Sequence, residues 1–327
     1  MATRAGHEVG GGHGVEMGRA GRLRAWVLRD DVNGLQAAWV PTAGMLGASL
    51  RHNGCELLWQ GDGVEAYARE RAFMGIPFLH PWANRLAGFT YRAGGHEVVL
   101  HPSSPLLLRD QNGLPIHGVL TASQRWSVRE FGAHEEGARL VAALNFDRPD
   151  LLATFPFPHE VEIEVQLGGV ALHVTTTVTA TGAEAVPVAF GFHPYLCIPT
   201  VPRARWKVSF PVSRRLELDE QLIPTGATQR VSPITGEIGD RTWDDGFDQI
   251  ETGSRFELSA DGRTIVFEYT DGYPVAQIFA PPEQEYVCVE PMTAPTNSLA
   301  SEDSALGWVA PGQSRSATFK ISCRWEP

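Results

Sequence analysis

A glutamate interrupts a short apolar segment near the C-terminal end of the chain. The segment Tyr286-Val287-Cys288-Val289-Glu290-Pro291-Met292 is typical of a buried strand, and Glu290 is its one carboxylate. Burying a carboxylate without partners is unfavourable or raises its pKa. A place at a sheet edge or an ion pair with an arginine would relieve that cost. The other interpretation is a carboxylate whose raised basicity serves acid–base chemistry.

The segment 75–85 gathers side chains that suit sugar recognition. It is bounded by prolines and contains Trp82, Asn84 and Arg85. The apolar face of a sugar ring packs on an aromatic ring, and its hydroxyls bind planar donors and acceptors. The alternative is a structural loop in which Asn84 caps a turn and Arg85 pairs with an acid.

Two histidines stand in segments that could present them to a cleft. His117 precedes Gly118, and His193 lies between Phe192 and Pro194. Because proline disfavours the helical region for the residue before it, we expect His193 on extended backbone. Apolar surroundings keep an imidazole neutral and a nearby carboxylate raises its pKa, a balance that suits a general acid near neutral pH. The alternative for both is a histidine with a structural role in the core.

Neither the histidines nor the cysteines show the spacing of a metal site. The candidate ligands are His80, His101, His117 and His193, without an HxH or HExxH pattern. The cysteines are Cys55, Cys197, Cys288 and Cys323, far apart and without a CxxC pair. We therefore expect no metal, no zinc knuckle and no disulfide framework.

The elements that must position these residues are mainly strands. Apolar residues alternate with polar ones over 161–167 and 172–178, over 256–258 and 265–269, and over 89–91 and 98–100. Glycine-containing turns separate the two halves of each pair, so three β-hairpins are predicted. The one clear helical signal is Val64 to Ala72. The fold class expected is all-β, a large antiparallel β-sandwich with few short helices.

The composition of the chain limits the classes of binding partner and the cellular location that we expect. The net charge is −11 with scattered acids, which argues against nucleic acid and membrane surfaces as partners. The chain has no apolar run of the length that spans a bilayer. Residues 1–21 are glycine-rich without a signal-peptide core, so we expect a disordered N-terminal lead-in followed by a single domain over 22–327 and a cytoplasmic location.

Four motifs together resemble the aldose 1-epimerases, also called galactose mutarotases. They are Trp82-Ala83-Asn84-Arg85, Ile116-His117-Gly118, Phe192-His193-Pro194-Tyr195 and Val289-Glu290-Pro291-Met292-Thr293. Each motif alone is weak, but their order and spacing match over about residues 23–325. The resemblance implies the galactose mutarotase-like supersandwich. One departure is Val119, which replaces the second glycine that many members have after His-Gly.

The resemblance also implies roles for individual residues. Glu290 is the expected general base and His193 the general acid. The expected substrate contacts are His117, Arg85, Asn84, Asp244, Gln277 and Trp82. Because Asp245 and Asp248 lie close by, the sequence leaves open which aspartate corresponds to the family's sugar-binding one. Gln277 is the weakest of the matches to family residues. The reaction needs no cofactor, because no hydride, electron or phosphoryl group moves, and the expected assembly is a monomer or homodimer.

The reaction so implied is the exchange of the α and β anomers of a free hexose such as glucose or galactose. A base at the C1 hydroxyl and an acid at the ring oxygen suffice, each typically contributing about 10²–10⁴-fold. One alternative is a hexose 6-phosphate or another modified sugar, with Arg69, Arg71 and Arg85 as candidate phosphate contacts. A second is a non-catalytic carbohydrate-binding domain.

Overall fold

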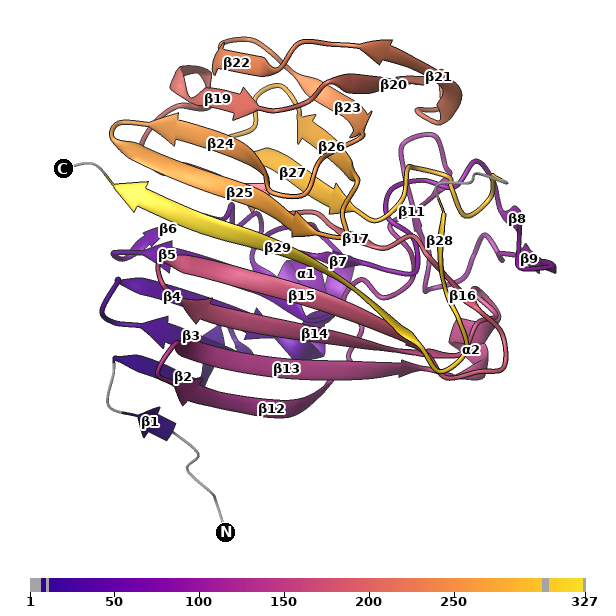
Figure 1. Ribbon diagram of the computed structural model, residues 1–327, viewed down its shortest axis with the longest axis horizontal. Coiled ribbons are helices and arrows are strands. Elements are labelled where there is room, and N and C mark those ends of the chain that lie inside the picture. The colour runs from indigo at the N-terminus through magenta and orange to yellow at the C-terminus, as the bar shows by residue number, and fades with distance from the viewer. Residues whose placement is uncertain (1–6, 10–11, 302–305, 326–327) are drawn as a thin grey trace.

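Antiparallel strands dominate the chain, and its helices are short (Figure 1). The computed structural model describes residues 7–9, 12–301 and 306–325. Within these ranges the helices are α1 (Val64–Glu70), α2 (Pro149–Leu152) and the 3₁₀ helices η1 (Pro41–Ala43) and η2 (Arg203–Arg205). None of the helices in these ranges is long and apolar enough to cross a membrane. The predicted all-β class is confirmed.

The largest sheet has nine strands. In spatial order they are β12 (Ser127–His134), β13 (Gly137–Phe146), β14 (His159–Gly168), β15 (Ala171–Ala180), β29 (Ser314–Trp325), β25 (Arg263–Asp271), β24 (Ser254–Ala260), β19 (Lys207–Phe210) and β22 (Ile234–Glu237). Figure 1 shows the long strands β12 to β15, β29 and β25 running side by side across the molecule.

A second sheet carries the glutamate identified in the sequence. Its strands are β21 (Pro224–Arg230), β20 (Arg214–Leu218), β23 (Trp243–Asp248), β26 (Val275–Ala280), β27 (Val287–Met292), β17 (Gly191–Phe192) and β7 (Phe78–Leu79), with β18 (Tyr195–Leu196) also paired to β27. The core joins this sheet to the nine-stranded one: the rings of Phe192 and Phe319 lie 5.1 Å apart, edge to face. The two sheets therefore form the layers of a sandwich.

The N-terminal strands make a third sheet and the loops carry three strand pairs. The third sheet is β1 (His7–Val9), β2 (His13–Ala20), β3 (Leu23–Asp30), β4 (Leu35–Val40), β5 (Leu46–His52) and β6 (Cys55–Glu56). The pairs are β8 (Thr90–Ala93) with β9 (His96–Val99), β10 (Leu108–Arg109) with β11 (Pro115–Ile116), and β16 (Val186–Val188) with β28 (Gly307–Val309). Trp26 of β3 packs on Phe131 of β12, with ring centroids 4.2 Å apart, so this sheet joins the nine-stranded one.

The three predicted hairpins are confirmed as β14–β15, β24–β25 and β8–β9. In β14 the apolar members Val161, Ile163 and Val165 are fully buried, because a strand sends alternate side chains to opposite faces. The predicted helix at 64–72 is α1, which ends two residues earlier.

The predicted disorder of residues 1–21 is wrong for residues 13–20. These form β2, which pairs along its whole length with β3, and Val15 is buried in the main core. The glycine-rich composition concealed the pairing, since a strand held by a neighbour's backbone needs few apolar side chains of its own. Residues 1–6 and 10–11 of the predicted lead-in lie outside the described residues.

Candidate active site

Glu290 lies in the middle of a sheet rather than at its edge. Strand β27 has β26 on one side and β17 and β18 on the other, and Glu290 is 2% exposed. Alternation sends Val287 and Val289 into the main core, whereas Cys288 and Met292 belong to small clusters on the other side. Glu290 therefore shares its face with Cys288 and Met292.

His193 contacts Glu290 directly. Its Nε2 lies 3.2 Å from Glu290 Oε1, and both side chains are buried. The residue connects β17 to β18; its backbone N–H donates to Pro77 O, and its ring stacks on Tyr195 at 4.6 Å. Backbone and ring contacts thus hold the imidazole against the carboxylate.

His117 approaches the same pair from the turn after β11. Its ring lies 5.4 Å from that of His193, edge to face. His117 has a φ of 62°, and its backbone N–H donates to Asn84 O. Gly118 follows with a φ of 69°, and a Cβ there would lie 2.1 Å from His80 O. Close backbone packing therefore requires glycine at position 118, directly after His117.

Arg85 connects the polar residues of the site. Its Nε donates to Asp110 Oδ2 at 2.7 Å and its Nη1 to Asn84 Oδ1 at 3.1 Å. Its Nη2 lies 3.7 Å from Asp244 Oδ2. Gln277, which is paired with Glu290 across β26 and β27, donates to Asp244 Oδ1 at 2.7 Å. This chain of contacts fixes the guanidinium and the Asp244 carboxylate relative to each other.

A pocket of about 370 Å³ collects most of the predicted residues. Its lining includes Asn84, Arg85, His117, His193, Asp244 and Glu290. Gln277 does not line the pocket but donates a hydrogen bond to Asp244, which does. Of the acids that left the register open, Asp245 lies 3.5 Å from Arg215 and Asp248 binds Arg214, so Asp244 is the acid that lines the pocket.

The prediction that Trp82 contacts substrate is wrong. Its side chain is 1% exposed, belongs to the main core and does not line the pocket. Residue 82 forms a bridge to Ala189, which directs the indole inward. The aromatic lining comes instead from Phe73, Tyr195 and Phe279.

Sequence reasoning missed several residues of the site. Asp110 is the clearest: its Oδ2 binds Arg85, while its Oδ1 accepts the backbone N–H groups of Asn112 and Leu114. An aspartate two residues before Asn112-Gly113 is a turn signal, and nothing local distinguishes it from other turns. Arg109 also lines the pocket and was missed, whereas Arg71, which lines it too, was named from the sequence only as a candidate phosphate contact.

Burial sets the protonation of the Glu290–His193 pair. Burial raises the pKa of Glu290 well above its usual value; Asp244 raises it further and Arg85 opposes the change. Burial lowers the pKa of His193 to about 3, and Arg85 lowers it as well. Burial also lowers the pKa of His117 well below its usual value. The favoured arrangement is therefore a protonated Glu290 beside a neutral His193.

The described part of the chain contains no cluster of three or more His, Cys, Asp or Glu side chains that could hold a metal ion. The pocket is instead lined by one carboxyl–imidazole pair, a second imidazole and a guanidinium network. Such a set can move protons at a small polar molecule and bind its hydroxyl groups.

Comparison with known proteins identifies the family. The sequence profile of the aldose 1-epimerase family matches residues 31–322. The uncharacterized protein YphB of Escherichia coli K12 is 28% identical over 168 residues, which are 47% of this chain and 56% of that protein. The match thus spans little more than half the length of that curated relative.

Solved structures share the fold. A galactose mutarotase-like protein from Clostridium acetobutylicum superposes with a TM-score of 0.81 at 18% identity, covering 95% of this chain and 98% of that one. For the Slr1438 protein of Synechocystis sp. PCC 6803 the TM-score is 0.75 at 23% identity, covering 94% and 98%. For galactose 1-epimerase of Lactobacillus acidophilus NCFM it is 0.75 at 14% identity, covering 99% and 98%. The chain therefore has the galactose mutarotase-like fold and belongs to the aldose 1-epimerase family.

Proposed function

We propose that this protein is an aldose 1-epimerase that interconverts the α and β anomers of an aldose. The observation that carries the proposal is the contact between His193 Nε2 and Glu290 Oε1, 3.2 Å long, in the lining of the 370 Å³ pocket. A carboxyl–imidazole pair supplies the base and the acid that anomer exchange requires, and the pocket is of a size that accepts a small molecule.

Ring opening moves two protons. Glu290 takes the proton of the C1 hydroxyl while His193 gives one to the ring oxygen, and the C1–O5 bond breaks to leave an aldehyde at C1. After rotation about the C1–C2 bond, the O5 hydroxyl attacks the other face of C1. The protons return along the same routes, so each group acts once as acid and once as base.

The pair must first reach its charged arrangement. A proton passes from Glu290 to His193 across their contact, leaving a carboxylate and an imidazolium. Arg85 acts on both ends of this step: it favours release of the proton by Glu290, whose pKa it lowers, and it opposes uptake by His193, whose pKa it also lowers. His117, Asn84, Arg85 and Asp244 are proposed to bind the sugar hydroxyls and the ring oxygen. Gln277 is proposed to hold Asp244.

Replacing either member of the pair tests the proposal. We expect Glu290→Gln and His193→Gln each to lower kcat about 10²–10⁴-fold, because each removes a positioned proton carrier. Exchange NMR on a panel of hexoses and hexose derivatives, with the uncatalysed rate subtracted, measures the effect. The control is Glu217→Gln on β20, where the side chain is exposed. Equal rates for wild type and Glu290→Gln on every sugar would refute the proposal.

The alternative of a non-catalytic carbohydrate-binding domain predicts a different result. Such a protein would bind a sugar in calorimetry without accelerating anomer exchange. The burial of Glu290 beside His193 favours the enzyme, because binding alone does not require a buried acid–base pair.

A further inference from the structure

Two arginines in the pocket have no carboxylate partner within the described part of the chain. Arg71, which follows α1, and Arg109, at the end of β10, both line the pocket. Among the described residues, no carboxylate oxygen lies within ion-pair distance of either guanidinium. Arg85, in contrast, is held by Asp110 at 2.7 Å and by Asp244 at 3.7 Å. The pocket therefore contains one compensated and two uncompensated guanidinium groups.

The two uncompensated arginines belong to one wall. The Arg71 guanidinium donates to Leu107 O at 3.3 Å and to Pro105 O. These carbonyls lie directly before β10, which ends at Arg109. Arg71 is half-buried and Arg109 is exposed. The contacts place Arg71 against the segment that leads to Arg109.

Several N–H donors of Arg71 and Arg109 have no acceptor among the described residues. A guanidinium carries five N–H donors and no acceptor. Arg71 donates two hydrogen bonds to backbone carbonyls, which leaves the other N–H groups available. For Arg109 no side-chain hydrogen bond is present within the described ranges. Burial lowers the pKa of Arg71, which shows that its charge is partly desolvated. A group that only accepts hydrogen bonds and carries negative charge would match this wall.

The charge of the pocket differs in sign from that of the chain. The lining contains three guanidiniums and the carboxylates of Asp110 and Asp244, so its net charge is positive when Glu290 is protonated. The whole chain carries a net charge of −11. A positive pocket in an acidic protein attracts a small anion while the rest of the surface repels it.

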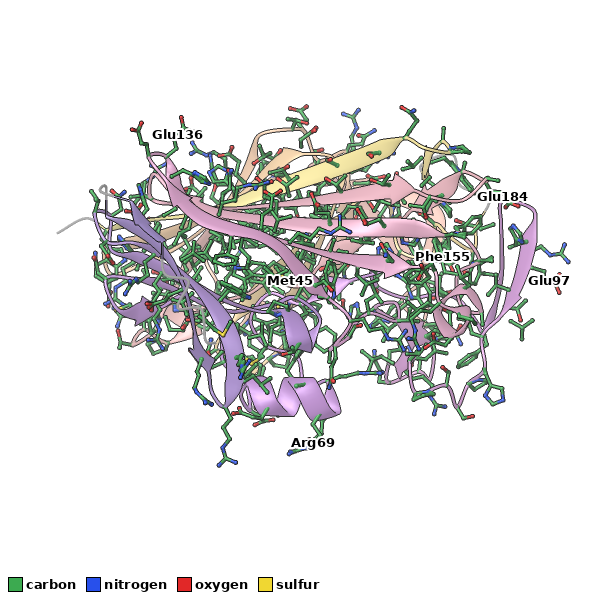
Figure 2. All side chains as sticks on the ribbon, turned by 90° about the horizontal axis from the view of Figure 1, so that it is seen from below. Met45, Arg69, Glu97, Glu136, Phe155 and Glu184 are labelled. Carbon is green, nitrogen blue, oxygen red and sulfur yellow. The ribbon has the colours of Figure 1, made fainter. Side chains whose placement is uncertain are left out.

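We propose that the substrate is an aldose with an anionic substituent, a phosphate ester or a carboxylate, which Arg71 and Arg109 bind while C1 faces Glu290. This inference rests on the proposed epimerase function. Of the arginines that the sequence suggested for such a group, Arg71 is placed to act. Arg69 is not: it pairs with Glu70, is 73% exposed and points outward from α1 (Figure 2).

The test compares neutral and anionic sugars by exchange NMR. The probes are glucose, glucose 6-phosphate and glucuronate, and the two anionic probes distinguish phosphate from carboxylate. Wild type is expected to show at least about tenfold higher kcat/KM on one anionic sugar than on glucose, a preference that rising salt reduces, as for a contact between exposed charges. Arg71→Gln and Arg109→Gln are each expected to lower that ratio about tenfold.

The controls separate binding from structure. Arg69→Gln is expected to leave the ratio unchanged, since that side chain lies on α1, two residues before Arg71, and outside the pocket. Arg109→Gln keeps the test decisive if Arg71→Gln disturbs the loop that Arg71 binds. Exchange that depends on Glu290 but is no faster on either anionic sugar overturns this inference and leaves the epimerase intact. No exchange dependent on Glu290 on any of the three sugars overturns both.

Discussion

Burial determines the charge of the two central residues of the site, Glu290 and His193. Glu290 and His193 are both buried, and burial shifts the pKa of each toward its neutral form. A buried pair of this kind is held at a cost in stability, because water would solvate the charged forms better. That cost gives a measurable signature at Glu290, independent of any substrate.

Glu290→Gln is expected to stabilise the folded protein, increasingly so as the pH rises. Above about pH 4.5 the unfolded state releases the Glu290 proton while the folded state keeps it, so wild-type stability falls with rising pH up to the raised pKa. Glutamine carries no such penalty. Thermal unfolding at pH 5 and pH 8 measures the effect as a larger gain in Tm at pH 8. A variant that is less stable than wild type at pH 8 would show that Glu290 is ionised and well paired.

At the scale of elements, the turn after β11 determines where His117 lies. Gly113 and Gly118 both have positive φ, but only at Gly118 would a Cβ meet another atom, at 2.1 Å from His80 O. Only the packing of the turn against the segment around His80 separates a permissive position from an obligatory one.

Gly118→Ala is therefore expected to be more harmful than Gly113→Ala. Each substitution places a non-glycine residue at positive φ, which costs roughly 1–3 kcal/mol. Gly118→Ala adds a backbone clash that must displace the turn, so we expect a larger loss of stability and a lower exchange rate. Chemical denaturation and exchange NMR on the two variants check this. Equal losses in both would show that the turn relaxes around the added methyl group.

The sequence could predict that strands form, but not which of their side chains face the core and which face the site. Alternation identified hairpins such as β14–β15, because a half-buried strand has period two. It could not show that Val287 and Val289 face the core while Cys288 and Met292 share the face of Glu290. Facing depends on which strands lie on either side, and those partners are distant in sequence.

At the scale of the whole molecule, two pairs of buried histidines lie in the sandwich. His80 and His159 form a pair in the core with 2.7 Å between their Nε2 atoms, and His117 and His193 belong to the pocket. The His159 Nδ1–H donates to Phe157 O, so its Nε2 accepts the Nε2–H of His80. Burial lowers the pKa of all four, to about 4 for His159 and about 3 for His193.

These histidines predict loss of stability in mild acid. Between pH 6.5 and pH 4 these histidines become protonated in the unfolded chain but stay neutral in the folded protein. The free energy of unfolding therefore falls as the pH falls. His159 alone accounts for a loss on the order of 3 kcal/mol over this pH range. Calorimetry of wild type and His159→Gln from pH 7.5 to pH 4 measures it, and the variant is expected to show the shallower slope. His134→Gln, at an exposed histidine, is the control and keeps the wild-type slope.

The sequence by itself determined the strand content, the hairpins and the candidate residues in four motifs. These signals are local: period-two alternation, turn chemistry and short motifs can each be recognised within a few consecutive residues, without knowing which segments pack against them. From them came Glu290, His193, His117, Asn84 and Arg85, all of which line the pocket.

Only the tertiary structure decided which side chains share one space. It buried Trp82, separated Asp244 from Asp245, added Asp110 and Arg109, and placed Arg71 in the pocket and Arg69 outside it. The physical reason is that a side chain's direction follows from strand pairing and loop packing between segments far apart in the chain. No window of sequence around Arg71 contains the carbonyls of Pro105 and Leu107 that hold it, or the pocket beside them.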